Sequence, residues 1–111
     1  MSGNFTVKNY SVVVPVYNEE DIVLQSASQI YDICKRQQLE FEIIFVENGS
    51  EDNTLSLIDG FIGDKKECRV ISLKLANYGN ALKQGFIQAN NEIVISFDID
   101  YFSEDFLNQA L

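Results

Sequence analysis

Apolar and polar segments alternate along the chain with the periods of strands and helices in turn. Short apolar runs rich in β-branched and aromatic residues predict strands buried on both faces, at positions 10–16, 41–46, 69–75 and 92–97. Between these runs, apolar residues recur every three or four positions, as in helices packed on a sheet. The connections are long enough for right-handed crossovers. The pattern predicts a three-layer α/β/α domain with a mostly parallel sheet.

Helical spacing predicts the buried faces of the helices. The apolar positions in register are Val23, Ala27, Ile30 and Cys34 in the first helix, Leu55, Ile58 and Ile62 in the second, and Leu82, Phe86 and Ala89 in the third. The acids Glu20 and Asp21 are expected in the first turn of the first helix, where the dipole favours them. Ser103 is expected to cap a last helix. Leu107 and Leu111 would lie on a face with little left to bury them, which indicates a truncation.

Composition and charge indicate one folded domain and argue against several classes of binding partner. With 111 residues, 46% hydrophobic and 23% charged, the chain has room for one core. A net charge of −9 argues against binding to nucleic acid or anionic membranes. Met1–Phe5 holds neither a basic nor an apolar run, and no apolar stretch approaches the roughly 20 residues that span a bilayer. The two cysteines have no metal-type spacing, so we expect reduced thiols and a cytoplasmic protein.

The most informative feature is Asp98-Ile99-Asp100, which directly follows the last predicted strand. The carboxyl ends of strands in an open α/β sheet are where ligands bind. In extended backbone, alternate side chains point the same way, so both carboxylates would face one ligand. Paired carboxylates suit a hard cation such as Mg²⁺ or Mn²⁺ that also binds phosphate. A solvated strand end with a helix-capping acid is the alternative interpretation.

Two other loops follow strand ends, at positions 17–19 and 47–50. In a doubly wound sheet these loops gather with the acidic pair along the carboxyl edge. Gly49 lets the backbone approach a ligand closely. We therefore expect a nucleoside between the first two loops, with its diphosphate reaching toward a cation at the third. Plain turn chemistry at Gly49-Ser50, and a helix cap at Asn53-Thr54, are equally open.

These segments together resemble the family 2 inverting glycosyltransferases, which have the Rossmann-like GT-A fold. The similar segments are Val13–Glu20, Val46–Thr54 and Phe97–Asp100, in that order and on the corresponding strand ends. The resemblance covers the N-terminal, nucleotide-binding half of the family. It implies that residues 1–111 form a single domain, truncated before the acceptor half.

The resemblance implies roles for residues of the first segments. Pro15, Tyr17 and Glu19 match the first nucleotide-contacting segment, with Tyr17 against the base and Glu19 near the ribose. Glu47 stands where the family usually has an aspartate that hydrogen-bonds the base, and Asn48 replaces a second common aspartate. Gly49 lies in the same segment.

The resemblance also implies roles for later residues. Gly79–Phe86 is similar to the family's glycine-rich helix start, in which a basic residue faces the nucleotide; here that residue is Lys83. A solvated helix face is the more ordinary reading of such a lysine. Asp98 would contact the ribose or the metal, and Asp100 would bind the metal that bridges the diphosphate.

By this resemblance the protein is a glycosyltransferase that takes a sugar from a UDP- or GDP-linked donor. The chain would supply donor and Mg²⁺ or Mn²⁺ binding. The catalytic base and the acceptor site belong to the family's second half, so the base is unknown here and the activity of this chain alone is uncertain. A full-length form would be cytoplasmic or membrane-associated. An exposed sheet edge would favour homo-oligomers.

Three other classes of protein share some of these sequence features. A non-catalytic nucleotide-binding or regulatory subunit fits the short length. A signalling receiver domain is also small, acidic and α/β, but it needs a phosphoacceptor aspartate after the third strand, and Leu75-Ala76-Asn77 has no acid. A nucleotidyltransferase would open with a glycine-rich basic loop, which Tyr17-Asn18-Glu19 does not resemble.

Overall fold

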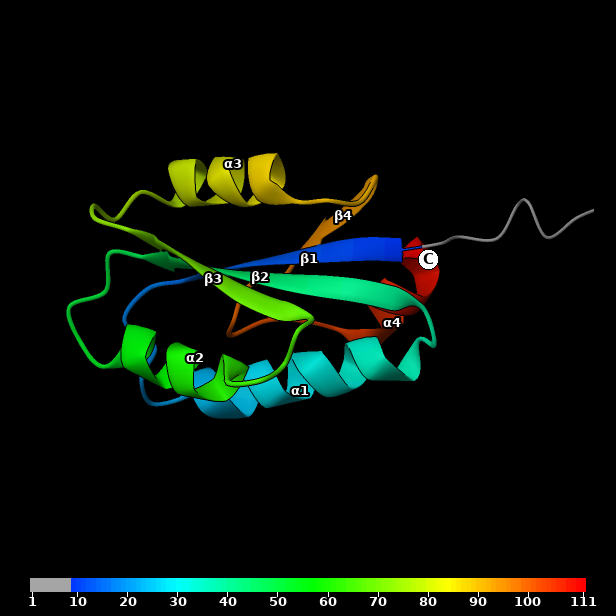
Figure 1. The fold of residues 1–111 in the computed structure, drawn as a ribbon, viewed down its shortest axis with the longest axis horizontal. Helices are drawn as coiled ribbons and strands as arrows, with labels where there is room; N and C mark the ends of the chain where they lie inside the picture. The colour runs from blue at the N-terminus through cyan, green and yellow to red at the C-terminus, as the bar shows by residue number, and fades with distance from the viewer. Residues whose placement is uncertain (1–8) are drawn as a thin grey trace, which may run out of the picture.

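The computed structural model describes residues 9–111, so the expectation for Met1–Phe5 lies outside the described residues. The strands are β1 (Asn9–Val16), β2 (Glu40–Asn48), β3 (Cys68–Leu73) and β4 (Ile93–Ser96). They form one parallel sheet in the order β3-β2-β1-β4. The helices are α1 (Val23–Arg36), α2 (Thr54–Ile62), α3 (Tyr78–Gln88) and α4 (Glu104–Ala110). Figure 1 shows α3 on one face of the sheet and the other helices on the opposite face, which confirms the predicted three layers.

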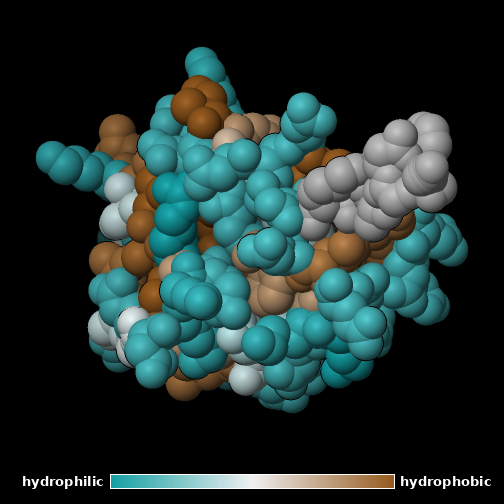
Figure 2. Space-filling view, turned by 45° about the vertical axis from the view of Figure 1, so that its right-hand side comes forward, coloured by the Kyte–Doolittle hydropathy of each residue, from teal (hydrophilic) through white to brown (hydrophobic). Residues whose placement is uncertain are grey.

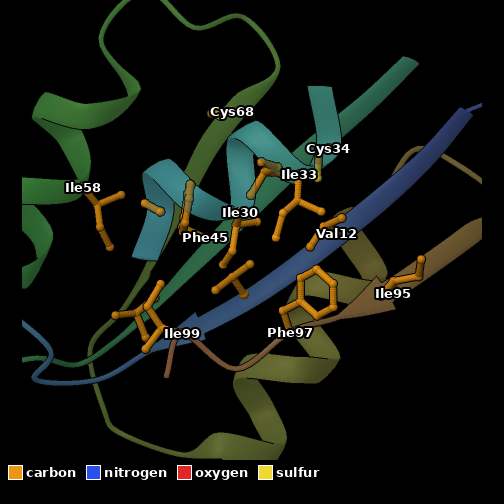
Figure 3. Close-up of a cluster of buried hydrophobic side chains, with 14 of the residues drawn as sticks. Val12, Ile30, Ile33, Cys34, Phe45, Ile58, Cys68, Ile95, Phe97 and Ile99 are labelled. Carbon is orange, nitrogen blue, oxygen red and sulfur yellow. The ribbon is translucent and has the colours of Figure 1, made fainter. Parts of the chain in front are cut away.

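The central strands β1 and β2 are buried on both faces because helices cover the sheet from both sides. Val12 and Phe45 face α1 and α2, where they pack with Ile30 and Ile58 (Figure 3). Val13, the neighbour of Val12, lies in the separate cluster under α3. Fully burying one such side chain stabilises the fold by about 1.5–3 kcal/mol. The near-continuous apolar runs in the sequence are the signature of this two-sided burial.

The strand order separates the fold from that of a signalling receiver. Receiver domains have the flavodoxin-like order 2-1-3-4-5, in which the first strand lies between the second and third. Here β1 lies between β2 and β4 instead. The order reverses between β1 and β4, so the topological switch point lies at the carboxyl ends of these two strands.

Some element boundaries differ from the prediction. The strand β2 extends through Glu47 and Asn48, which pair with Val16 of β1 and Leu73 of β3, so these residues do not begin a loop. The helix α1 begins at Val23, and its first turn contains no acid. The expectation that Glu20 and Asp21 lie in the first turn of this helix is therefore wrong. Glu20 and Asp21 lie in the preceding turn, where hydrogen bonds with Asp52 and Asn53 hold Glu20.

The helix α3 packs through small residues, which corrects the predicted face. Its buried residues are Ala81 and Gly85, whereas Phe86 is exposed. A Cβ atom on Gly85 would overlap Cγ1 of Val13 and would lie 3.2 Å from its Cγ2. The backbone of α3 therefore lies almost directly on β1, and the large residues are displaced to the flanks of the helix.

The last helix is better buried than the sequence indicated. Ser103 caps α4 as predicted, with its hydroxyl accepting from the Phe106 amide at 3.1 Å. Leu107 is fully buried in the main core and Leu111 packs against it, so the expectation that little is left to bury them is wrong. Arg36 of α1 donates from Nε to Glu104 at 2.9 Å, which ties α4 to the end of α1.

A polar network anchors the other end of α3 to the amino edge of the sheet. Glu42 of β2 accepts from the Ser11 hydroxyl and from the Asn90 amide, both at 2.6 Å. Arg69 lies 3.6 Å from Glu42 and also donates to the carbonyl of Gln88, the last residue of α3. Burial opposes the charge of Glu42, yet these donors hold the pKa of its carboxyl below the ordinary value.

The surface is mainly hydrophilic, in keeping with the charge of the chain. Figure 2 shows polar residues covering most of one face, with apolar residues in smaller patches between them. The helix α1, with 14 residues, is the longest of those described. None of the helices between residues 9 and 111 is both long and apolar enough to cross a membrane. Cys34 and Cys68 are buried free thiols.

Replacing Gly85 by alanine is expected to destabilise the fold by about 1–3 kcal/mol, because both methyl groups of Val13 block the new Cβ. The better helix propensity of alanine, about 1 kcal/mol, offsets only part of this cost. Gly60 of α2 is the matched control, since a Cβ there meets nothing within 4 Å. Gly60→Ala should stabilise by about 0.5–1 kcal/mol. Urea unfolding of both variants measures the difference, and equal stabilities would contradict the close packing of α3.

The Glu42 network should make stability fall in acid. Because the folded pKa is lowered, its contribution is complete above the unfolded pKa of about 4.3 and is lost as pH falls through the folded value. Glu42→Gln should cost about 1–3 kcal/mol at pH 7, where hydrogen bonds to a charged group are lost. Urea unfolding from pH 7 to pH 3 should show the two proteins converging. A pH-independent difference would exclude this role of the charge.

Candidate functional site

The loops after β1 and β2 are linked by reciprocal hydrogen bonds. The Asn18 amide donates to the Ser50 hydroxyl at 2.8 Å, and the Asn18 side chain accepts from the Glu51 amide at 2.8 Å. Asn18 has a φ of 51°, a left-handed conformation that asparagine tolerates better than most residues. These bonds satisfy backbone groups that a mobile loop would leave to water, so the two loops form one unit.

A buried threonine completes this link. The Thr54 hydroxyl accepts from the Glu19 amide at 2.9 Å and donates to Asp52 at 2.5 Å. Asp52 also accepts from the Thr54 amide at 2.9 Å. A side-chain helix cap by Asn53, one of the interpretations left open by the sequence, does not form: the Asn53 side chain makes no capping bond, and Asp52 accepts from the Thr54 amide. The start of α2 therefore fixes the backbone of Glu19.

The segment after β4 is a turn rather than extended backbone. The Tyr101 amide donates to the Asp98 carbonyl at 3.0 Å, which closes the chain over Ile99 and Asp100. Extended geometry was expected here, and that expectation is wrong. Ile99 is buried in the core, whereas Asp98 and Asp100 are exposed. Insertion of Ile99 into the core thus turns both carboxylates outward.

A cleft of about 290 Å³ lies where these segments meet. It is at the carboxyl ends of β1 and β4, the switch point of the sheet. Its volume is close to the lower end of ligand pockets, about 300 Å³. Its lining residues are Pro15, Val16, Tyr17, Glu19, Asn48, Tyr78, Asp98, Ile99 and Asp100.

Five of the site residues predicted from sequence line this cleft together. They are Pro15, Tyr17, Glu19, Asp98 and Asp100. Two segments that lie about 80 residues apart in the sequence supply them, residues 15–19 and 98–100, and the strand-end argument placed both at this edge of the sheet. Their roles toward a nucleotide or a metal stay predictions.

Three other predicted residues lie away from the cleft. Glu47 is almost fully buried and accepts from the Ser50 amide at 2.6 Å, so its carboxylate braces the loop. Gly49 has a φ of 75°, and a Cβ there would lie 2.8 Å from the Ala76 nitrogen, so the backbone that approaches it belongs to the chain itself. Lys83 is exposed on α3. A nucleotide contact by any of the three stays a prediction.

Four residues of the cleft lie outside the predicted set, and two of them, Asn48 and Tyr78, carry polar side chains. Asn48 is buried, and its side-chain oxygen accepts from the Asn77 amide at 2.8 Å. Tyr78 donates from its hydroxyl to Oδ1 of Asp98 at 2.9 Å. The sequence signal for Tyr78 was its place at the start of a helix after a strand end, where side chains reach the same edge of the sheet.

The cleft is strongly acidic. Burial raises the pKa of Glu19, and the nearby charges of Asp100 and Asp52 raise it further. No group of three potential metal ligands of the Asp, Glu, His or Cys type occurs within residues 9–111. The pair Asp98 and Asp100 still suits Mg²⁺ or Mn²⁺, which is held by one or two carboxylates together with phosphate and water. A cation there would offset the acidic field against an anionic ligand.

Comparison with known proteins agrees with this geometry. Residues 11–109 match the model of glycosyl transferase family 2. The chain therefore belongs to this family.

Relatives with curated names match most of the chain. The chain is 36% identical over 103 residues to an undecaprenyl-phosphate 4-deoxy-4-formamido-L-arabinose transferase of Proteus mirabilis (strain HI4320). It is 33% identical over 102 residues to the enzyme of that name from Yersinia pestis (strain Pestoides F). Each match covers 90% of this chain but only 31% of the relative.

Solved structures share the fold. The TM-score is 0.75 to the mannosyltransferase PcManGT from Pyrobaculum calidifontis, in complex with GDP-Man and Mn²⁺, at 23% identity over 92% of this chain and 31% of that one. It is 0.71 to S. aureus TarS 1-349 in complex with UDP, at 27% identity over 94% of this chain and 31% of that one. The chain has the nucleotide-binding architecture of GT-A glycosyltransferases.

Replacing Thr54 by valine should release Glu19 from the loop unit. Valine keeps the shape but leaves the Glu19 amide without its acceptor, at a cost of about 1–3 kcal/mol. Amide hydrogen exchange followed by NMR should show faster exchange at Glu19. Thr54→Ser is the control, because it keeps the hydroxyl and should keep the protection. Equal protection in both variants would contradict this role of the hydroxyl.

Proposed function

We propose that the chain binds the nucleotide-sugar donor of a glycosyltransferase. One observation carries the proposal: a family 2 chain places Asp98 and Asp100 in the same cleft as Tyr17 and Glu19, at the switch point of its sheet. Ligands of open α/β sheets bind at this position. The named ligands of solved relatives, UDP and GDP-Man with Mn²⁺, support a nucleoside diphosphate in this cleft.

The proposed nucleoside contacts come from the end of β1. The Tyr17 ring is 44% exposed beside the cleft, so it offers a face on which a base stacks. Thr54 fixes the Glu19 backbone, and the Glu19 side chain in the lining of the cleft would accept from ribose hydroxyls. Pro15 and Val16 form the apolar floor at the strand end.

Asp98 and Asp100 are the proposed ligands of Mg²⁺ or Mn²⁺. When bound, such a cation neutralises charge on the diphosphate and stabilises it as a leaving group. The protein supplies two oxygen ligands on a turn whose backbone is held by the Tyr101 amide and by the burial of Ile99. Donor phosphates and water would complete the coordination.

No residue of this chain is proposed for the sugar contacts, the acceptor site or the catalytic base of transfer. In transfer, such a base takes the proton of the acceptor hydroxyl as it attacks the anomeric carbon. A second candidate is donor binding by this chain without transfer. Incubation with a nucleotide sugar separates the two, since transfer or hydrolysis releases the nucleoside diphosphate.

Calorimetric titration of UDP and GDP, with and without Mn²⁺, tests the proposal. We expect one nucleotide to bind more tightly with Mn²⁺, and Asp98→Ala/Asp100→Ala to reduce that affinity by at least about tenfold because both cation ligands are lost. Asp59→Ala/Asp64→Ala is the matched control, because it changes the net charge equally at two exposed positions outside the cleft. A folded wild-type chain that binds neither nucleotide would refute the proposal.

A further inference from the structure

Tyr78 lies at the junction of two hollows on the surface. It lines the acidic cleft, and with Asp98 it also lines a neighbouring hollow of about 520 Å³. The neighbouring hollow is walled largely by apolar side chains, which include Leu82, Phe97 and Phe106. The hydrogen bond from Tyr78 to Asp98 therefore separates a polar site from an apolar one.

The start of α3 holds Tyr78 in place from both sides. The Asn77 side chain caps the helix by accepting from the Asn80 amide at 2.9 Å. The Asn77 amide donates to the buried side chain of Asn48 at 2.8 Å. Gly85, two turns further along, lies directly on Val13 of β1. These contacts fix the start of α3 relative to the sheet, and with it the position of Tyr78.

The Asp98 side chain has little other support. It is exposed, and the Tyr101 amide holds its carbonyl but not its carboxylate. Among residues 9–111, Tyr78 is the one side chain that hydrogen-bonds this carboxylate. The bond occupies Oδ1, and a carboxylate has about four acceptor positions, so Oδ2 stays open to a cation. The hydrogen bond from Tyr78 to Oδ1 thus also fixes the direction in which Oδ2 of Asp98 points.

We infer that Tyr78 is a positioning residue, whose hydroxyl orients the Asp98 carboxylate for a divalent cation bound with the donor. The inference rests on the proposed function. Partners that hydrogen-bond a metal-ligating side chain fix its orientation, and their loss commonly costs about 10–100-fold in metal affinity. Because Asp98 is exposed, we expect the lower end of that range for Tyr78.

Manganese binding to the chain, followed by the EPR signal of free Mn²⁺ in the presence of UDP or GDP, tests the inference. Tyr78→Phe keeps the ring and removes only the hydroxyl, and should weaken Mn²⁺ binding about tenfold. Nucleotide binding without metal should not change. Tyr101→Phe is the matched control, because Tyr101 is 80% exposed beside the same turn and should leave Mn²⁺ binding unchanged.

A double-mutant cycle with Asp98→Asn locates the effect. If Tyr78 acts through Asp98, then Tyr78→Phe adds no further loss once Asp98 is replaced. Equal or tighter Mn²⁺ binding by Tyr78→Phe, or an additive loss in the double variant, overturns the inference and leaves the donor site standing. Absence of nucleotide-dependent Mn²⁺ binding by the wild type overturns the inference and the proposed cation site together.

Discussion

Parallel pairing of β1 with β4 brings together chain segments that are far apart in sequence. Val13 and Ser96 are opposite each other in this pairing, and the Phe97 amide extends it by donating to the Val13 carbonyl at 3.0 Å. Because the strands are parallel, both leave the sheet at the same edge. The Tyr17 and Asp98 segments meet there, and the reversal of strand order keeps the neighbouring helices from covering the gap. Without this pairing there is no cleft.

The loops after β1 and β2 and the start of α3 are held mainly by polar contacts. The loops after β1 and β2 exchange hydrogen bonds through Asn18 and Thr54, so their backbones are fixed where apolar packing ends. The helix α3 is clamped at both ends, by Asn48 near the cleft and by the Glu42 network at the opposite edge. Because Gly85 packs directly on Val13, α3 lies close to the sheet, and Tyr78 at its start is near enough to hydrogen-bond Asp98. The two linked loops and α3 therefore hold the walls of an acidic, open cleft in place.

Much of the fold follows from local pattern, because burial on both faces of a strand leaves a near-continuous apolar run and packing of a helix leaves a periodic one. Strands, helices and the parallel class were predicted from runs such as Val12–Val16, and the Ser103 cap from its hydroxyl. The carboxyl-edge rule also placed Tyr17, Glu19, Asp98 and Asp100 together, as the structure confirms. The face of α3 was not predictable, since it depends on which strand residue lies beneath Gly85.

The sequence by itself determined the class of fold, the family and the edge of the sheet at which chemistry is expected, because these depend on residue order and periodicity alone. Tertiary structure decided which polar side chains face a ligand and which serve the fold. Glu47 and Gly49 contact other parts of the chain within the loops. Tyr78 hydrogen-bonds Asp98 because contacts at both ends of α3 fix the position of that helix. Such contacts join residues from different elements, and their geometry exists only once the sheet has assembled.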